Sequence, residues 1–305
     1  MPKVLNLALG TGATTLLVAG AAVGVGHLRF RRQVGTEVTA LLERGRTASR
    51  EIVRPDDLAG LPPPVQRWLV HANVVGRPRP RIVYLTQTGV MRAERDQPWM
   101  PVCAEQYFTT DPPGFEWIAT MQMNPLVWVT GRDRYFDGEG AMDMLAMSVV
   151  PVVHARGPEL NQGVLLRYLT ETVWFPAAVL TPYISWQPID NLAARATLAY
   201  RGTSASATFT IDDHGAVLQA QADRYREEHG SYALHPWSIP ITEYGEFAGI
   251  RMPVAGDATW RLEGGDLPYY RWRITSVTYD PPKSLTEPLH HDDADDRVLA
   301  TADSA

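Results

Sequence analysis

Residues 167–176, with the sequence RYLTETVWFP, carry the side chains best suited to a ligand site. On a helix, Arg167 and Glu171 share one face, because they are four residues apart, and they can form an ion pair. The sequence leaves two interpretations of this pair open. It is either an exposed or capping pair, or it lies in an apolar cavity where Glu171, with Tyr168, orients the polar head of a ligand.

In the second interpretation, aromatic side chains form the wall of the cavity. Trp174, Phe175 and Trp186 are the candidates, because large aromatic side chains bury much apolar area and Trp adds an N–H donor. Methionine adapts to irregular apolar partners and also fills ordinary cores, so Met121 and Met123 are further candidates. The predicted ligand-binding residues are Arg167, Tyr168, Glu171, Trp174, Phe175, Trp186, Met121 and Met123.

The sequence contains no catalytic or metal-binding motif that we recognise. It has no GxSxG, GxGxxG or P-loop motif, and its histidines lack the HExxH spacing. The single cysteine, Cys103, excludes an internal disulfide and a cysteine-rich metal site. We therefore predict no catalytic residue, metal or cofactor. A hydrolase-like enzyme is an alternative, with Glu171 or Asp190 as general base if burial raises the pKa of that carboxyl group. Arg224 is a further candidate for a polar contact.

Composition narrows the class of protein. The 305 residues include 45% hydrophobic and 20% charged side chains, which allows a large globular core. The net charge of −6 argues against a nucleic-acid partner, because there is no basic excess to neutralise phosphates.

The amino-terminal residues predict a membrane anchor. Residues 4–28 contain no charged side chain apart from His27, and about 20 apolar residues suffice to cross a bilayer. A cleaved signal peptide is the rival, because residues 19–21, AGA, fit a cleavage site. Arg29, Arg31 and Arg32 follow at once and favour a cytoplasmic body by the positive-inside rule. We predict an anchor over residues 1–28.

The next elements must position the ligand site. Residues 29–75 are predicted as a helical neck and a first packing helix, in which Val65, Trp68, Leu69 and Ala72 repeat at helical spacing. A curved antiparallel β domain is predicted over residues 76–282.

Within this domain the apolar period is two. In residues 115–123, FEWIATMQM, one face is apolar and the other, which carries Glu116, is expected to face water. A helix is inserted near residues 158–180, where Leu165, Leu166 and Leu169 keep helical spacing. Residues 283–305 form an acidic tail without aromatic side chains, which we predict to be disordered.

Four segments carry a family resemblance: LPPPVQRWL at 61–69, GFEW at 114–117, LRYLTETVWFP at 166–176 and YGEFAGIRMP at 244–253. Together they resemble an uncharacterised bacterial family of membrane-anchored proteins that carries an E-x-x-W-F-P element, here residues 171–176. At the level of the fold, the last segment is similar to the LolA-like carriers of lipoproteins and lipids. That resemblance implies a curved sheet around helices that hold acyl chains, and an extracytoplasmic location, so the side of the membrane stays open.

The predicted fold is α+β: a strongly curved antiparallel sheet, a LolA-like half-barrel, with helices on its concave face and an amino-terminal transmembrane helix. The predicted function is a non-enzymatic binder or carrier of a hydrophobic, lipid-like ligand at the membrane. The alternative is a membrane-anchored scaffold or assembly protein with a membrane-protein partner. The expected partners are membrane lipid or a hydrophobic small molecule, and no nucleic acid.

Overall fold

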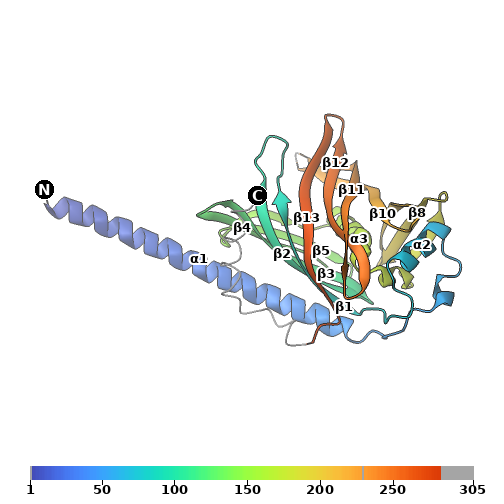
Figure 1. The fold of residues 1–305 in the computed structure, drawn as a ribbon. Helices are drawn as coiled ribbons and strands as arrows, with labels where there is room; N and C mark the ends of the chain where they lie inside the picture. The colour runs from blue at the N-terminus through green and yellow to red at the C-terminus, as the bar shows by residue number, and fades with distance from the viewer. Residues whose placement is uncertain (1, 229, 283–305) are drawn as a thin grey trace.

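The computed structural model describes residues 2–228 and 230–282, and within them the side chains of residue 18 and of residue 20 onward. One curled antiparallel sheet of 13 strands forms a half-barrel, against which a few helices pack (Figure 1). The half-barrel confirms the prediction of a strongly curved antiparallel sheet. The acidic tail predicted over residues 283–305 lies outside the described residues.

The sheet consists of two meanders joined through the first and last strands. Its strands are β1 (Ile82–Met91), β2 (Met100–Thr110), β3 (Pro113–Asn124), β4 (Val127–Phe136), β5 (Glu139–Ala146), β6 (Val150–Ala155), β7 (Ile184–Pro188), β8 (Ala193–Tyr200), β9 (Thr203–Ile211), β10 (Val217–Glu228), β11 (Ser231–Phe247), β12 (Ile250–Leu262) and β13 (Gly265–Tyr279). The spatial order is β6-β5-β4-β3-β2-β1-β13-β12-β11-β10-β9-β8-β7. The edge strands β6 and β7 are therefore consecutive in the chain, and the helical segment between them connects the two edges of the half-barrel.

This helical segment lies against the concave face. It comprises α3 (Pro158–Glu171) and the short 3-10 helices η2 (Thr172–Trp174) and η3 (Pro176–Leu180). α3 contacts strands of both meanders, among them β4, β5, β9 and β10. Leu165, Leu166 and Leu169 are fully buried, as their helical spacing predicted. The predicted helix thus breaks into three pieces, because Pro176 cannot continue the hydrogen-bonding pattern of an α-helix.

A second helix covers the strands of the carboxyl-terminal meander. The chain passes η1 (Pro55–Leu58) and enters α2 (Pro63–His71), which contacts β8 and β9. Val65, Trp68, Leu69 and the C-cap residue Ala72 are buried, which confirms the apolar face expected from their spacing. Trp68 stacks on Phe209 of β9 with ring centroids 5.7 Å apart.

The first helix packs on the opposite, convex face of the sheet. α1 (Pro2–Gly45) is continuous over 44 residues, and Phe30, Val34, Val38, Leu41 and Leu42 form a buried stripe. That stripe packs against Ile82 and Tyr107, whose sequence neighbours Val83 and Phe108 belong to the concave core. The sequence predicted residues 29–75 as a neck and a first packing helix; the structure continues the neck into α1 and packs it on the convex face, while α3 lies on the concave face as predicted.

The packing of α1 also changes the expected polarity of β3. Phe115, Trp117, Ala119 and Met121 are buried on the concave face, as the alternation predicted. Glu116 was expected to face water, but it is only 2% exposed, because α1 covers this part of the convex face.

Within the part of the chain that the structure describes, no helix has a stretch long and apolar enough to cross a membrane. The anchor over residues 1–28 stays a prediction.

Candidate functional site

A cavity of about 140 Å³ lies between the helical segment and the half-barrel. One side is formed by α3 and η2, and the other by strands of both meanders. Its lining is mainly aromatic and aliphatic, as in most small-molecule sites. The largest apolar contributors are Met91, Trp117, Met142, Met144, Trp174, Trp237, Tyr270 and Trp272.

A buried ion-pair network lies at the cavity wall. The Arg167 guanidinium donates to Glu171 Oε1 and Asp133 Oδ2, each at 2.7 Å. It also lies over the rings of Phe115 and Trp117, 5.1 and 4.9 Å from their centroids. Since i,i+4 spacing brings Arg167 and Glu171 together on α3 while β4 supplies Asp133, the helix is joined to the sheet through one arginine.

Side-chain amides extend this network along the sheet. Gln106 Nε2 donates to Glu171 Oε2 at 2.7 Å, and Gln87 Nε2 donates to Gln106 Oε1 at 3.1 Å. The Tyr270 hydroxyl donates to Gln87 Oε1 at 2.7 Å. Both oxygens of Glu171 are thus occupied, which fixes the orientation of its carboxyl group.

Burial disfavours the charged form of both carboxyl groups. Desolvation raises the pKa of Asp133 above its ordinary value, and the charge and hydrogen bond of Arg167 oppose this only in part. The pKa of Glu171 is also raised by desolvation, against the opposing effects of Arg167 and Gln106. Arg224, which also lines the cavity and lies beside Gly163 of α3, contributes a second positive charge that opposes the rise in the pKa of Asp133.

Three buried polar atoms of cavity-lining residues have no hydrogen-bond partner among the described residues. They are Trp117 Nε1, Trp174 Nε1 and Asp133 Oδ1. The three residues are 2%, 4% and 1% exposed, so bulk water does not replace the missing partners. An unpaired buried polar group costs about 1–3 kcal/mol.

Arg224 is held between two aromatic side chains. Its guanidinium lies 4.9 Å from the ring centroid of Trp237 and 5.9 Å from that of Trp260. It donates to the Tyr269 hydroxyl at 3.0 Å, which also accepts a bond from Trp237 Nε1 at 3.1 Å. The side chain is therefore oriented before any ligand arrives.

The structure brings only some of the predicted site residues together. Arg167, Glu171 and Trp174 line the cavity. Tyr168 and Phe175 are buried elsewhere: the Tyr168 hydroxyl donates to the Thr109 carbonyl at 2.9 Å, and the ring centroid of Phe175 lies 4.7 Å from that of Phe108.

The other predicted residues lie apart from the cavity lining. Trp186 packs edge-on against Trp68 with centroids 6.2 Å apart, under α2. Met121 is buried in the core, whereas Met123 is 55% exposed because β3 extends beyond the packed body. Asp190, the alternative base, accepts a hydrogen bond from the Leu192 amide in the turn before β8.

Several cavity residues were not predicted. Trp117 lies on the apolar face that the alternation marked, so its position was available from the sequence. Asp133 follows Arg132 in a strand of mixed polarity and gave no signal of burial. Trp237 and Trp272 belong to distant strands, and only the curvature of the sheet brings them to α3.

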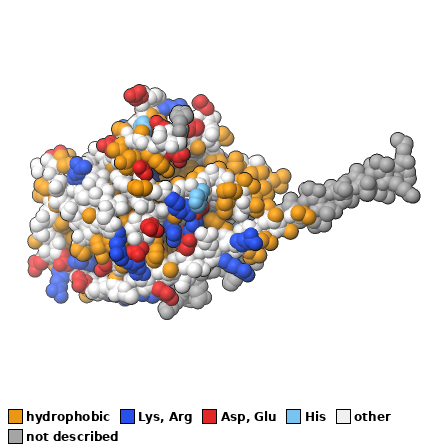
Figure 2. Space-filling view, turned by 180° about the vertical axis from the view of Figure 1, so that it is seen from behind, with side chains coloured by type: hydrophobic (Ala, Val, Ile, Leu, Met, Phe, Trp, Pro, Cys, Tyr) orange, Lys and Arg blue, Asp and Glu red, His pale blue; other side chains and the backbone are white. Residues whose placement is uncertain are grey.

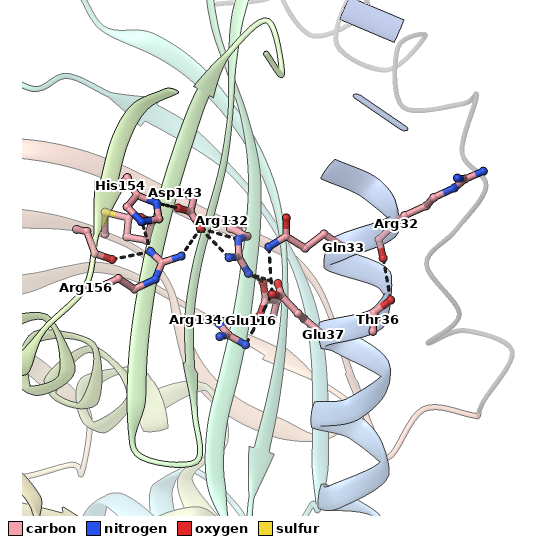
Figure 3. Close-up of polar contacts among 12 residues, drawn as sticks. Arg32, Gln33, Thr36, Glu37, Glu116, Arg132, Arg134, Asp143, His154 and Arg156 are labelled. Carbon is pink, nitrogen blue, oxygen red and sulfur yellow. Dashed lines mark hydrogen bonds and ion pairs between the residues drawn. The ribbon is translucent and has the colours of Figure 1, made fainter. Parts of the chain in front are cut away.

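A second buried charged cluster lies on the convex face beneath α1 (Figure 3). Arg132 forms ion pairs with Glu37 of α1 and with Asp143, the latter at 2.7 Å, and lies 3.9 Å from Glu116. Burial, followed by the negative charge of Glu37, raises the pKa of Glu116 well above its ordinary value. These pairs join the helix to β3, β4 and β5.

The fold and the cavity define a half-barrel protein with an internal, mainly apolar cavity. The chain belongs to DUF6544, a family of unknown function, whose model matches residues 51–272. The matched range contains every residue that lines the cavity. A solved structure of a DUF1329 family protein from Desulfovibrio piger is similar over 74% of this chain and 98% of that chain, with 10% identity and a TM-score of 0.38. A comparison with curated proteins gives no match.

Proposed function

We propose that the protein binds a lipid-like ligand, with an apolar chain and an oxygen-containing head, in the cavity beneath α3. One observation carries the proposal: Trp117 and Trp174 line a mainly apolar cavity, and the indole N–H of each is buried without a hydrogen-bond partner among the described residues. Most buried polar groups in a filled core are hydrogen-bonded. Trp186 Nε1 also lacks a partner, but Trp186 does not line the cavity. A head-group oxygen would accept hydrogen bonds from the two indoles.

The charged side chains at the cavity also favour a ligand with an oxygen-containing head group. The guanidinium groups of Arg167 and Arg224 both line the cavity, and burial raises the pKa values of the neighbouring Asp133 and Glu171. The two arginines favour a ligand that brings acceptor atoms or negative charge. The apolar chain would be held by burial of its surface, worth about 25 cal/mol per Å² before ordering costs.

The size of the cavity bounds what it holds. A cavity of about 150 Å³ in another protein accommodates benzene, and the cavity described here measures about 140 Å³. It therefore fits one end of a chain, and a longer ligand would extend outward between α3 and the strands. We place this activity at a membrane through the anchor predicted over residues 1–28, on a side that the sequence leaves open.

The test compares two Trp→Phe variants of the full-length protein. Trp174→Phe keeps an aromatic ring and removes an unpartnered N–H at the cavity. Trp68→Phe is the matched control, because Trp68 is at least as deeply buried but belongs to α2 and does not line the cavity. Each protein is purified from a bacterial host in detergent and compared by native and denaturing mass spectrometry.

We expect a discrete ligand mass in the wild-type protein and in Trp68→Phe, and a loss of that mass in Trp174→Phe at nearly unchanged thermal stability. A folded wild-type protein that stays empty after incubation with total membrane lipid would contradict the proposal. Equal loss of ligand and of stability in both variants would identify the region as core.

A hydrolase-like enzyme is the second candidate, because Glu171 is a desolvated carboxyl group at the cavity with a raised pKa. Its two oxygens already accept hydrogen bonds from Arg167 and Gln106, which supports an orienting role over proton abstraction. Incubation with membrane lipid separates the two roles. Product formation by the wild-type protein that Glu171→Gln abolishes would favour the enzyme.

A further inference from the structure

A second apolar surface lies outside the core, at the end of the sheet beside α1. Met123 and Leu126 of the β3–β4 hairpin are 55% and 78% exposed, and Val149, Val150 and Val152 of the β5–β6 hairpin are 41%, 59% and 61% exposed. We call these five residues the apolar rim. Large apolar side chains gathered at one place on a surface mark an interaction site.

The two hairpins and the helix form one continuous surface. The Met147 amide donates to the Trp128 carbonyl at 2.8 Å, which links the two hairpins. His27 of α1 hydrogen-bonds to Ser148 at 3.3 Å. A Cβ atom at Gly26 would collide with the Ser148 carbonyl, so this glycine permits the helix to lie directly on the turn. Hydrophobic side chains are seen beside the point where α1 leaves the body (Figure 2).

The charges on α1 are arranged around this surface. Arg29 and Arg32 are exposed, whereas residues 4–26 contain no charged side chain. Val149 lies beside Gly26, where an added Cβ atom would meet its side chain, and it lines a shallow groove with Ala22, Val25 and Arg29. Three residues of helix separate Gly26 from Arg29, which is about 5 Å along the axis. An amphipathic element in a bilayer interface is buried about 5–10 Å deep, so arginines at the level of the head groups would place the rim at that depth.

We propose that the apolar rim inserts into the interfacial layer of a bilayer that contains anionic lipids, with Arg29 and Arg32 against the phosphates. The arginines favour a negatively charged surface, and the uncharged stretch of α1 continues from the rim in the same direction. A protein partner would explain the exposed apolar side chains. It would not explain why the uncharged stretch of α1, the apolar rim and the arginines follow one another along the helix. The membrane surface thereby fixes the orientation of the half-barrel, independently of any ligand in the cavity.

The test places a single fluorescent probe at one position of the full-length chain. Cys103 is exposed, so it is first replaced by serine, and Leu126→Cys, Val150→Cys or Ile189→Cys is then labelled with an environment-sensitive dye. Ile189 is the matched control, because it is 54% exposed in the turn after β7 and far from the rim in the strand order. The labelled proteins are reconstituted in vesicles of phosphatidylcholine with and without phosphatidylglycerol.

We expect a blue shift of the dye at positions 126 and 150, and its quenching by lipids that carry a quencher near the head group. Both effects should weaken without phosphatidylglycerol, and neither should occur at position 189. No quenching at positions 126 and 150, or equal quenching at all three positions, would overturn the proposal.

Discussion

Consecutive residues of β4 carry the two buried charged clusters, one on each face of the sheet. Because successive side chains of a strand point to opposite faces, Arg132 lies under α1 on the convex face and Asp133 under α3 on the concave face. Each is almost fully buried, at 3% and 1% exposure. Each also joins the sheet to a helix through an ion pair, Arg132 to Glu37 and Asp133 to Arg167.

The two clusters differ in what surrounds them. The convex cluster is packed between α1 and the strands, and Arg132 contacts three carboxyl groups (Figure 3). The concave cluster borders the cavity, where Asp133 and two tryptophans keep unpartnered polar atoms. Buried charge by itself therefore does not indicate a ligand site. Unpartnered polar atoms do not separate the clusters either, because Glu116 Oε1 and Arg134 Nε of the convex cluster also lack a hydrogen-bond partner. The cavity beside the unpartnered indoles distinguishes the concave face.

The largest expected loss of stability is that of a variant of the convex cluster, and it tests whether this cluster stabilises the fold. Arg132→Met would leave Glu37, Glu116 and Asp143 without their shared cation, and loss of one partner of a buried pair costs about 3–5 kcal/mol. We expect a loss near the upper end of this range in urea unfolding. Hydrogen exchange over residues 30–45 should also accelerate, because α1 loses one of its ion pairs with the sheet.

An exposed pair on the same sheet is the control for this variant. Arg273 and Glu243 are 2.5 Å apart and about half exposed, so Arg273→Met should cost less than about 1 kcal/mol. If both variants lose the same free energy of unfolding, burial does not distinguish the clusters.

Removal of the arginine should lower the free energy of unfolding less in the concave cluster than in the convex cluster. Arg167→Met leaves Asp133 and Glu171 unpaired, but both carboxyl groups have raised pKa values and can take up protons. We expect a loss of about 3 kcal/mol at neutral pH. The loss of stability should shrink toward about pH 5. Without Arg167, the folded-state pKa values of Asp133 and Glu171 rise further, so the variant gains more stability than the wild-type protein when these groups are protonated. That contribution is lost as pH rises.

Urea unfolding of Arg167→Met and the wild-type protein at both pH values measures this difference. A loss independent of pH would mean that the arginine contributes by packing on Phe115 and Trp117 and not by charge. Arg132→Met, measured in parallel, shows whether the pH dependence is specific to the concave face.

The fold was more accessible to sequence reasoning than the site. Alternation in residues 115–123 placed Phe115, Trp117, Ala119 and Met121 on one buried face, because a period of two depends only on local geometry. It could not show that α1 buries Glu116 on the other face, since that contact joins residues far apart in the sequence. The curvature of the sheet was likewise inferred from the inserted helix, not from any single strand.

The site depended on packing that no local pattern encodes. Helical spacing correctly put Arg167 beside Glu171, yet it could not separate the cavity residue Trp174 from the core residue Phe175 next to it. Their exposures are nearly equal, 4% and 1%. Only the position of the surrounding strands gives Trp174 a neighbouring cavity, while Phe175 is packed against Phe108.

The smallest expected effect is that of a substitution at Glu116. This residue of β3 belongs to the convex cluster, whereas its neighbour Trp117 points to the opposite face and lines the cavity. Burial raises the pKa of Glu116 well above its ordinary value, so its stabilising protonated form is lost as pH rises through the folded-state pKa.

Glu116→Gln keeps the shape of the side chain and removes its ionisation. The variant should equal the wild-type protein at about pH 4 and exceed it in stability at alkaline pH. Urea unfolding across this range measures the difference, and a variant that is less stable at alkaline pH would show that an ionised Glu116 stabilises the contact with Arg132. The convex cluster would then be a net attraction between charges, and its contrast with the concave cluster would rest on the cavity alone.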